Sequence, residues 1–163
     1  MKKLSYLFAA LLMLVLAGCG SKRSQAFYNM PSQLLSTTYD GRYIIRVQVR
    51  SKDAVVAFED GKRKAIQEVI FDGVKAANSG IEDLKPLIFD INAREKYEDY
   101  FRAFFSDKKE WDQFADYFGR RVVTTRYERD GRQMVETVTV QVDRAGIKQK
   151  LQNDGIIPRE GRY

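Results

Sequence analysis

Residues 121–142 read RVVTTRYERDGRQMVETVTVQV, and this stretch decides the fold. Its two halves, Arg121–Glu128 and Gln133–Val142, are rich in β-branched residues, which favour strands. The tetrapeptide Arg129-Asp130-Gly131-Arg132 joins them, and Asp-Gly between two such runs is the strongest short-range signal for a β-hairpin. Along the second half valines alternate with threonine and glutamine, interrupted by Glu136. This alternation predicts a sheet with one buried face and one face in contact with water.

A further strand and a long helix are predicted upstream of the hairpin. Tyr43–Arg50 is rich in β-branched residues and alternates in its second half, so we expect a strand there. Asp53 can cap a helix whose apolar residues recur every three or four positions. We expect this helix to run to Ala77, with Asn78-Ser79-Gly80 as its stop signal. Its apolar residues are Phe58, Ala65, Ile66, Val69, Ile70, Val74 and Ala77.

Two aromatic-rich helices are predicted between the first helix and the hairpin. The first begins at Asn92 and carries Ala93, Tyr97, Tyr100, Phe101, Phe104 and Phe105 on one side. The second carries Trp111, Phe114, Ala115 and Phe118, and Gly119 ends it. Because both apolar arcs are one-sided, we expect the pair to form a second layer of the core. The alternative is an exposed partner-binding surface, with Tyr100, Phe105 and Tyr117 as its contacts.

A last helix follows the hairpin and completes the predicted order of elements. Asp143 can cap it, Ile147 and Leu151 lie on one face, and Gly155 with Pro158 ends it. The order β-α-(α-α)-β-β-α predicts an α+β fold, a small antiparallel sheet with helices packed on one face. We assign this domain to residues 42–157, followed by a C-terminal tail, residues 158–163.

The N-terminus has the three-part pattern of a secretory signal. Lys2 and Lys3 precede an apolar run that is shorter than a membrane-spanning helix, and small residues follow it. The tetrapeptide Leu16-Ala17-Gly18-Cys19 resembles the lipobox of bacterial lipoproteins. The alternative is an ordinary secreted protein whose only cysteine falls there. The resemblance implies a signal peptide at 1–18, a lipidated tether at 19–41 and acyl chains such as palmitate on Cys19.

The resemblance also implies a place in the cell. Gly20 follows the cysteine, and the segment 20–23 carries no acid, so we expect a lipid anchor in the outer membrane that faces the periplasm. Since Cys19 is the only cysteine in the chain, no intrachain disulfide can form. The mature net charge of about +4, spread along the chain, is too small to indicate nucleic acid binding.

The domain itself resembles a known type in its pattern. The helix with Ala65, the late hairpin ending Val138-Thr-Val-Gln-Val142-Asp143 and the helix at Ile147–Leu151 look like the N-terminal domain of flagellar assembly protein T. Small outer-membrane lipoproteins share this domain type. The resemblance covers roughly residues 42–155, and the aromatic pair 92–118 would be an insertion. It implies a scaffold or assembly domain without catalytic residues.

The residue types restrict the chemistry that is available. The chain has no histidine, and its single thiol is assigned to the lipid, so neither imidazole nor thiol catalysis is expected. We therefore predict no enzyme, no metal and no cofactor. A carboxylate-based hydrolase or a ligand-binding protein acting on envelope glycans remains an alternative, because Glu68 and Asp72 are one helical turn apart. Acids flanked by Lys62, Arg63 and Lys64, as Glu59 and Asp60 are, ordinarily form a solvated helix face instead.

Arginines gather around the hairpin, with Arg129 and Arg132 at its turn. They fit either a patch for lipid phosphates or an acidic partner, or a charged edge that deters strand pairing, and the second is preferred. Together these features predict a lipid-anchored envelope protein that binds a protein partner as a scaffold or assembly module. The oligomeric state stays open.

Overall fold

The computed structural model describes residues 32–51, 54–107, 109–119, 123–127 and 134–159. Its strands are β1 (Gln33–Thr37), β2 (Tyr43–Ser51), β3 (Lys75–Ala76), β4 (Ala115–Tyr117), β5 (Val123–Tyr127) and β6 (Met134–Val142). Its helices are α2 (Ala54–Gln67), α3 (Ala93–Lys96), α4 (Glu98–Arg102) and α5 (Arg144–Asn153). Short π-helical turns η1 (Glu68–Asp72) and η2 (Ala103–Asp107) and a 3-10 turn η3 (Glu110–Phe114) complete them. The predicted α+β class is confirmed.

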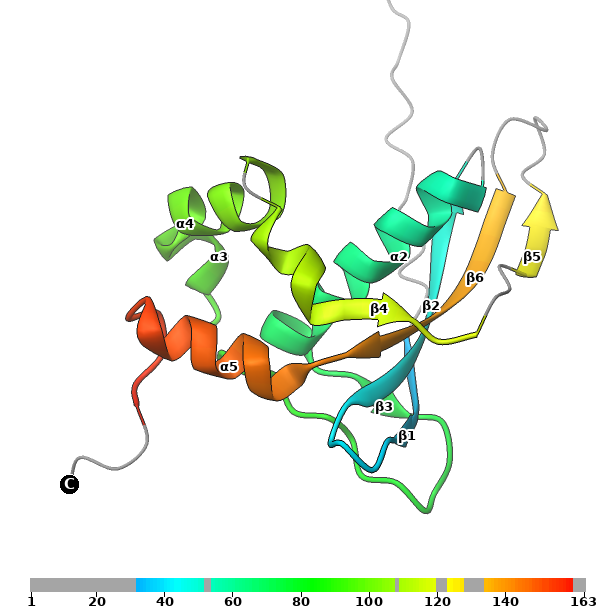
Figure 1. The fold of residues 1–163 in the computed structure, drawn as a ribbon, viewed down its shortest axis with the longest axis horizontal. Helices are drawn as coiled ribbons and strands as arrows, with labels where there is room; N and C mark the ends of the chain where they lie inside the picture. Colours follow the sequence, from blue (N-terminus) through cyan, green and yellow to red (C-terminus); the bar gives the residue numbers. More distant parts are fainter. Residues whose placement is uncertain (1–31, 52–53, 108, 120–122, 128–133, 160–163) are drawn as a thin grey trace, which may run out of the picture.

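The described strands form one sheet, ordered β3-β1-β2-β6-β4, with β5 also paired to β6 (Figure 1). The centre is the antiparallel pair β2–β6, whose register runs from Tyr43 opposite Val142 to Ser51 opposite Met134. Pairing of β5 with β6 confirms the predicted hairpin strands, while the turn 129–132 lies outside the described residues. The expectation of an entirely antiparallel sheet is wrong at one edge, because β1 and β3 are parallel.

The domain begins before residue 42, which corrects the predicted end of the tether at 41. Strand β1 pairs antiparallel with β2, from Gln33 opposite Arg46 to Thr37 opposite Tyr43. Leu34 is only 1% exposed and belongs to the core. The strand was missed because its sequence, QLLST, is short and mostly polar; one buried leucine does not make a detectable alternation.

The first helix ends earlier than its sequence pattern predicts. Helix α2 continues into η1 and stops at Gly73, rather than at Asn78-Ser79-Gly80. Gly73 has a φ of +76°, and a Cβ there would lie 2.6 Å from the carbonyl oxygen of Leu84. Only glycine fits both this left-handed backbone and this close approach. The chain then turns into β3, so of the predicted helical positions Val74 forms a β-bridge with Leu84 and Ala77 lies in a bend after β3.

Helix α2 lies along β2 and β6 and covers one face of the sheet (Figure 1). The side chains of Ile45, Val47, Val138 and Val140 on that face are fully buried. Gly61 permits close packing, since a Cβ there would lie 3.1 Å from the Cβ of Val138. On the alternate positions of β6, Thr137, Thr139 and Gln141 are partly exposed, as the alternation predicted.

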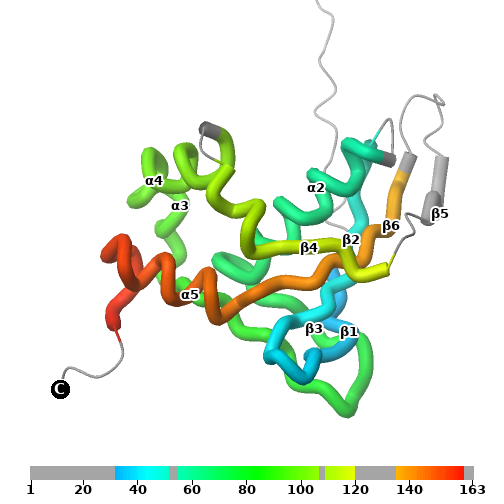
Figure 2. The backbone as a smooth tube through the Cα atoms, in the orientation of Figure 1, coloured from blue at the N-terminus to red at the C-terminus, as the bar shows by residue number. Residues whose placement is uncertain are grey.

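The aromatic segment forms a second part of the core beside α5, which continues directly from β6 (Figure 2). Instead of the two regular helices predicted here, the segment forms the short elements α3, α4, η2, η3 and β4. Phe101, Phe104 and Trp111 are at most 6% exposed, so their predicted burial is confirmed. Phe118 is 48% exposed, and its placement in the core is wrong. Asp143 caps α5 as predicted, accepting a hydrogen bond from the Gly146 amide at 2.9 Å.

Candidate functional site

The residues predicted for function fall into three groups. Cys19, Arg129 and Arg132 lie outside the described residues. Phe105 is only 8% exposed, which corrects its prediction as a partner contact, because its ring packs among Phe101 and Phe104. Tyr100 and Tyr117 remain accessible in part.

Tyr100 is half-buried, and its hydroxyl is already engaged. It donates a hydrogen bond to Asp154 Oδ2 at 2.6 Å. Burial, together with this bond to a carboxylate, raises the pKa of Tyr100 far above its ordinary value. The hydroxyl therefore joins the aromatic segment to the end of α5, and this role ties Tyr100 to the fold.

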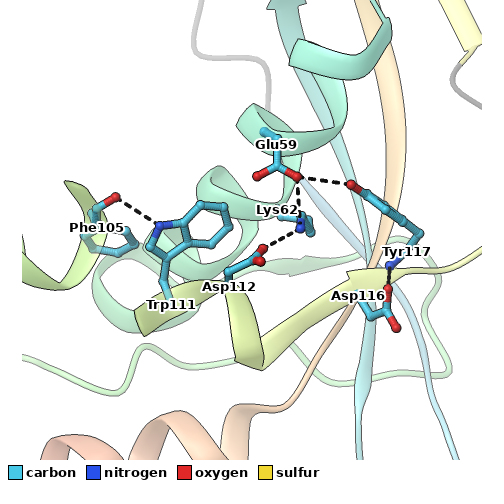
Figure 3. Close-up of polar contacts among 7 residues, drawn as sticks. All are labelled: Glu59, Lys62, Phe105, Trp111, Asp112, Asp116 and Tyr117. Carbon is cyan, nitrogen blue, oxygen red and sulfur yellow. Dashed lines mark hydrogen bonds and ion pairs between the residues drawn. The ribbon is translucent and has the colours of Figure 1, made fainter. Parts of the chain in front are cut away.

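Lys62 lies at the centre of a cluster that includes the predicted contact Tyr117 (Figure 3). Although charged, it is 6% exposed. Its Nζ lies 3.1 Å from Glu59 Oε1 and also forms an ion pair with Asp112. The same nitrogen lies 5.0 Å from the ring centre of Tyr117 and 5.6 Å from that of Trp111. One cation thus links α2 to both η3 and β4.

Lys62 and the Tyr117 hydroxyl both stay protonated at neutral pH, because the pKa of each group is raised. Burial alone would lower the pKa of Lys62, but the bonds to Asp112 and Glu59 outweigh it, so the pKa is raised. The pKa of Tyr117 is also raised, by burial first and then by the acceptor Glu59. A general base needs a pKa near the operating pH, and neither group has one. The cluster is suited to holding β4 against α2.

For Lys62, the predicted solvated helix face shared with Arg63 and Lys64 is wrong, because its side chain is buried. A signal was present in the spacing, because Lys62 is four residues from both Phe58 and Ile66 on the apolar stripe of α2. Residues four apart lie on the same helix face. The charge masked this position, since a buried lysine requires partners that lie about 50 residues away in sequence, as Asp112 does.

Beside the cluster, three apolar side chains are exposed around the end of β4, those of Val55, Tyr117 and Phe118; we call these residues the β4 edge. The ring of Tyr117 contacts that of Phe58 with centroids 4.5 Å apart, and its hydroxyl donates to Glu59 Oε1 at 3.2 Å. Tyr117 is 41% exposed, and Val55, one turn before Phe58, is 73% exposed. Phe118, the residue after Tyr117, is 48% exposed.

The backbone of the β4 edge is partly closed to further strands. The Phe118 amide donates to the Thr139 carbonyl oxygen at 3.0 Å, so the amide of Tyr117, one residue earlier, faces away from β6. The Asp116 side chain accepts that amide's hydrogen at 2.7 Å. A charged side chain that caps an edge donor discourages pairing with another strand. A partner can therefore contact the side chains of the β4 edge more readily than it can form hydrogen bonds with the backbone.

A polar cleft of about 290 Å³ lies beside Lys62 and Asp112. It is lined by Arg42, Lys62, Asp112, Gln113, Phe114, Ala115, Asp116, Gln141 and Asp143. Two of its carboxylates are in use, Asp112 on Lys62 and Asp143 on the cap of α5. The lining combines donors and acceptors suited to a small hydrophilic group. No group of three or more acidic side chains in the described residues could hold a metal ion.

The acids proposed for a hydrolase are held by separate basic residues. Glu68 lies 3.8 Å from Lys64 Nζ, and Asp72 lies 2.8 Å from Arg94. Burial raises the pKa of Glu68, as a general acid would require. Asp72 is exposed, however, and Glu68 lines neither the cleft beside Asp112 nor the two shallow clefts near Phe71. The two carboxylates do not face a shared cleft there.

No protein-family model, curated protein or solved structure matches the chain. The resemblance to the N-terminal domain of flagellar assembly protein T stays a prediction. Of the helices in the described part of the chain, none has the length and apolar character needed to cross a membrane.

Proposed function

We propose that this chain is a lipid-anchored envelope protein that binds a protein partner through the β4 edge, as a scaffold or assembly module. The observation that carries the proposal is the exposure of Val55, Tyr117 and Phe118, at 73%, 41% and 48%, beside the Lys62 ion pairs that hold β4 against α2. Aromatic side chains of this kind anchor protein interfaces.

The rigid support beneath the β4 edge favours this role. Tyr117 is held on one side by Phe58 and on the other by the Lys62 ion pairs, so its ring is ordered before any partner arrives. A preordered anchor loses little side-chain entropy on binding. Because Asp116 caps the outward amide of Tyr117, the partner is expected to pack on side chains rather than to extend the sheet.

The lipid anchor is supported by the lipobox pattern. Cys19 precedes β1, the first described element, in the sequence. Two or three acyl chains suffice for stable membrane attachment. The address we propose is the periplasmic face of the outer membrane.

Metabolic labelling tests the anchor. Wild-type cells given labelled palmitate should incorporate it into this protein, and Cys19→Ala should abolish incorporation and release the protein from the membrane fraction. Ser21→Ala, two residues further on, is the matched control. Label in the Cys19→Ala protein, or its continued sedimentation with the outer membrane, would contradict the proposal.

Site-specific photocrosslinking tests the partner surface. A photoreactive phenylalanine at Phe118 should yield a discrete protein adduct in intact envelopes. The control is the same residue at Tyr39, which is fully exposed on the β1–β2 turn, away from β4. Adducts of equal yield at both positions, or none at Phe118, would argue against the β4 edge.

The polar cleft favours a second candidate, a glycan-binding protein. Saccharide hydroxyls both donate and accept hydrogen bonds; in the cleft the carboxylates accept, the arginine donates and the glutamine amides do both. Calorimetric titration with soluble envelope glycan fragments, using Gln141→Ala as the comparison, would detect this. Heat that is unchanged in Gln141→Ala would count against the cleft.

A further inference from the structure

Two strongly exposed apolar side chains lie in the segment between β3 and α3. Phe89 is 73% exposed and Ile91 is 96% exposed. Next to them, Phe71, Pro86 and Ile88 line a shallow cleft of about 280 Å³ together with Phe89 and Ile91. Asp72, Asp90 and Arg94 complete the lining, so the apolar side chains stand in a cluster with a charged border. A cluster of this kind indicates an interaction site more strongly than scattered single residues do. We call residues 84–92 the Phe89 loop.

The Phe89 loop is fixed to the fold by backbone hydrogen bonds. The amides of Leu87 and Ile88 donate to the carbonyl oxygens of Val69 and Ile70 at 3.1 and 2.9 Å. The amide and carbonyl of Leu84 both bond Val74 at 2.8 Å. The two exposed side chains thus stand on a supported segment, directly beside the end of η1.

The loop lies near Ser32, the first residue that the structure describes. Strand β1 pairs with β3 so that Gln33 lies opposite Lys75, which places Ser32 beside Val74. Val74 in turn pairs with Leu84. Two strand spacings of about 4.8 Å each therefore separate Ser32 from the start of the loop.

Two ion pairs lie at the border of the loop. Arg94 lies 2.8 Å from Asp72, and its guanidinium carbon lies 4.1 Å from the ring centre of Phe71. Lys96 lies 3.3 Å from Asp90 within the same region. These four charges are therefore paired within the fold, and what the loop offers to a partner is Phe89 and Ile91 together with exposed Lys85. The fitting partner is one that accepts Phe and Ile and tolerates exposed ion pairs at its border.

We propose that the Phe89 loop inserts Phe89 and Ile91 into the interface of the bilayer that carries the lipid on Cys19. Whatever its conformation, the segment 19–31 cannot span more than about 45 Å, because a residue adds at most about 3.6 Å. The domain is thus kept near the bilayer, with the loop near Ser32, which follows this segment. Aromatic and aliphatic side chains at such positions enter the boundary between headgroups and acyl chains. This inference rests on the proposed lipid anchor.

The test couples the mature chain to vesicles through its only cysteine. The chain 19–163 is made without the signal, and Cys19 is joined to a maleimide-headgroup lipid in phosphatidylcholine vesicles, with or without brominated acyl chains that quench tryptophan. Phe89→Trp provides the probe. Tyr39→Trp is the matched control, since it is fully exposed but lies beyond the opposite end of β1. The native Trp111 is 0% exposed and gives the baseline.

The expected result is strong quenching in the Phe89→Trp protein and none above baseline in Tyr39→Trp. Adding Ile91→Ser to Phe89→Trp should lower the inserted-to-free ratio about tenfold, which is the effect of withdrawing one such side chain from an apolar phase. Equal quenching at positions 39 and 89, or none at 89, would overturn the inference. Because the coupling is chemical, a failure of palmitate labelling in cells would count against the proposed anchor alone.

Discussion

Two aromatic regions only a few residues apart in sequence differ completely in their burial. In the first, the aromatic layer of Phe101, Phe104 and Trp111, exposure is 6%, 2% and 0%. In the second, the β4 edge, Tyr117 and Phe118 are 41% and 48% exposed. The aromatic layer faces α5, whose Ile147 and Leu151 are fully buried, whereas Phe118 lies at the end of an edge strand.

An aromatic side chain therefore does not by itself indicate whether a residue lies in the core or at an interface. What decides is whether another element lies opposite. Lys62 marks the boundary between the two regions, with Trp111 of the layer on one side of its ammonium group and Tyr117 of the β4 edge on the other. Substitutions on either side of this boundary should therefore have very different effects.

The largest effect is expected in the aromatic layer. Phe104→Ala should lower the free energy of unfolding by about 3–5 kcal/mol, since it removes a buried ring that contacts Phe101, Phe105 and Phe114. Phe114→Ala should cost less, because that ring is only partly buried. Urea titration of the unlipidated mature chain measures both. A change within error for Phe104→Ala would remove the distinction between the two regions.

At the boundary, Lys62→Met should lower the free energy of unfolding by about 1–2 kcal/mol. This is less than the cost of breaking a fully buried pair, because Glu59 and Asp112 remain 40% and 49% exposed and can be hydrated. Methionine preserves the apolar stem. The unfolding midpoint in urea at neutral pH is the measurement, with exposed Lys85→Met as control. Greater stability of Lys62→Met would mean that burial of the ammonium group outweighs its two ion pairs.

Lys62 also predicts a loss of stability at alkaline pH. Its folded pKa is raised above the ordinary value of 10.5, so the unfolded chain releases this proton first as the pH increases. The contribution is fully present below pH 10.5 and is lost as the pH rises through the folded pKa. The difference in urea midpoint between the wild type and Lys62→Met should therefore be constant from pH 7 to 9 and shrink above 10.5. A difference that grows there would contradict the assigned direction.

A smaller effect is expected from Tyr100→Phe, which tests the bond between the layer and α5. At pH 7 the loss of one hydrogen bond should cost about 0.5–1.5 kcal/mol. Burial and the bond to Asp154 raise the folded pKa of Tyr100 above its ordinary 10.0, so the wild type loses stability as the pH rises beyond that value. The phenylalanine variant lacks this loss. The difference in free energy of unfolding between the wild type and Tyr100→Phe, measured by urea titration, should therefore shrink above pH 10. A difference that stays constant would exclude the hydrogen bond.

The smallest effect is expected at the β4 edge. Phe118→Ser should change the free energy of unfolding by less than about 0.5 kcal/mol, as surface substitutions usually do. Envelope photocrosslinking from a probe at Val55 should nevertheless be lost in the Phe118→Ser protein. A large loss of stability in a thermal melt would instead place Phe118 in the core and blur the comparison.

Local patterns gave the elements that need only near neighbours. The α+β class, the β5–β6 pairing, the wet face of β6 and the Asp143 cap follow from alternation and capping, which act over a few residues. β1 was missed because its partners, β2 and β3, rather than its own composition, make it a strand. The end of α2 was misplaced because the requirement for glycine at position 73 comes from Leu84.

For the candidate site, the sequence by itself determined the signal pattern, the single cysteine and the absence of histidine, because residue types and short spacings are properties of the chain alone. Tertiary structure alone decided that Lys62 is buried, that Phe105 is inaccessible and that Tyr117 and Phe118 stay exposed. It also decided that the Phe89 loop lies near Ser32. Each of these depends on contacts between distant segments, and no local periodicity specifies which segment will lie opposite another.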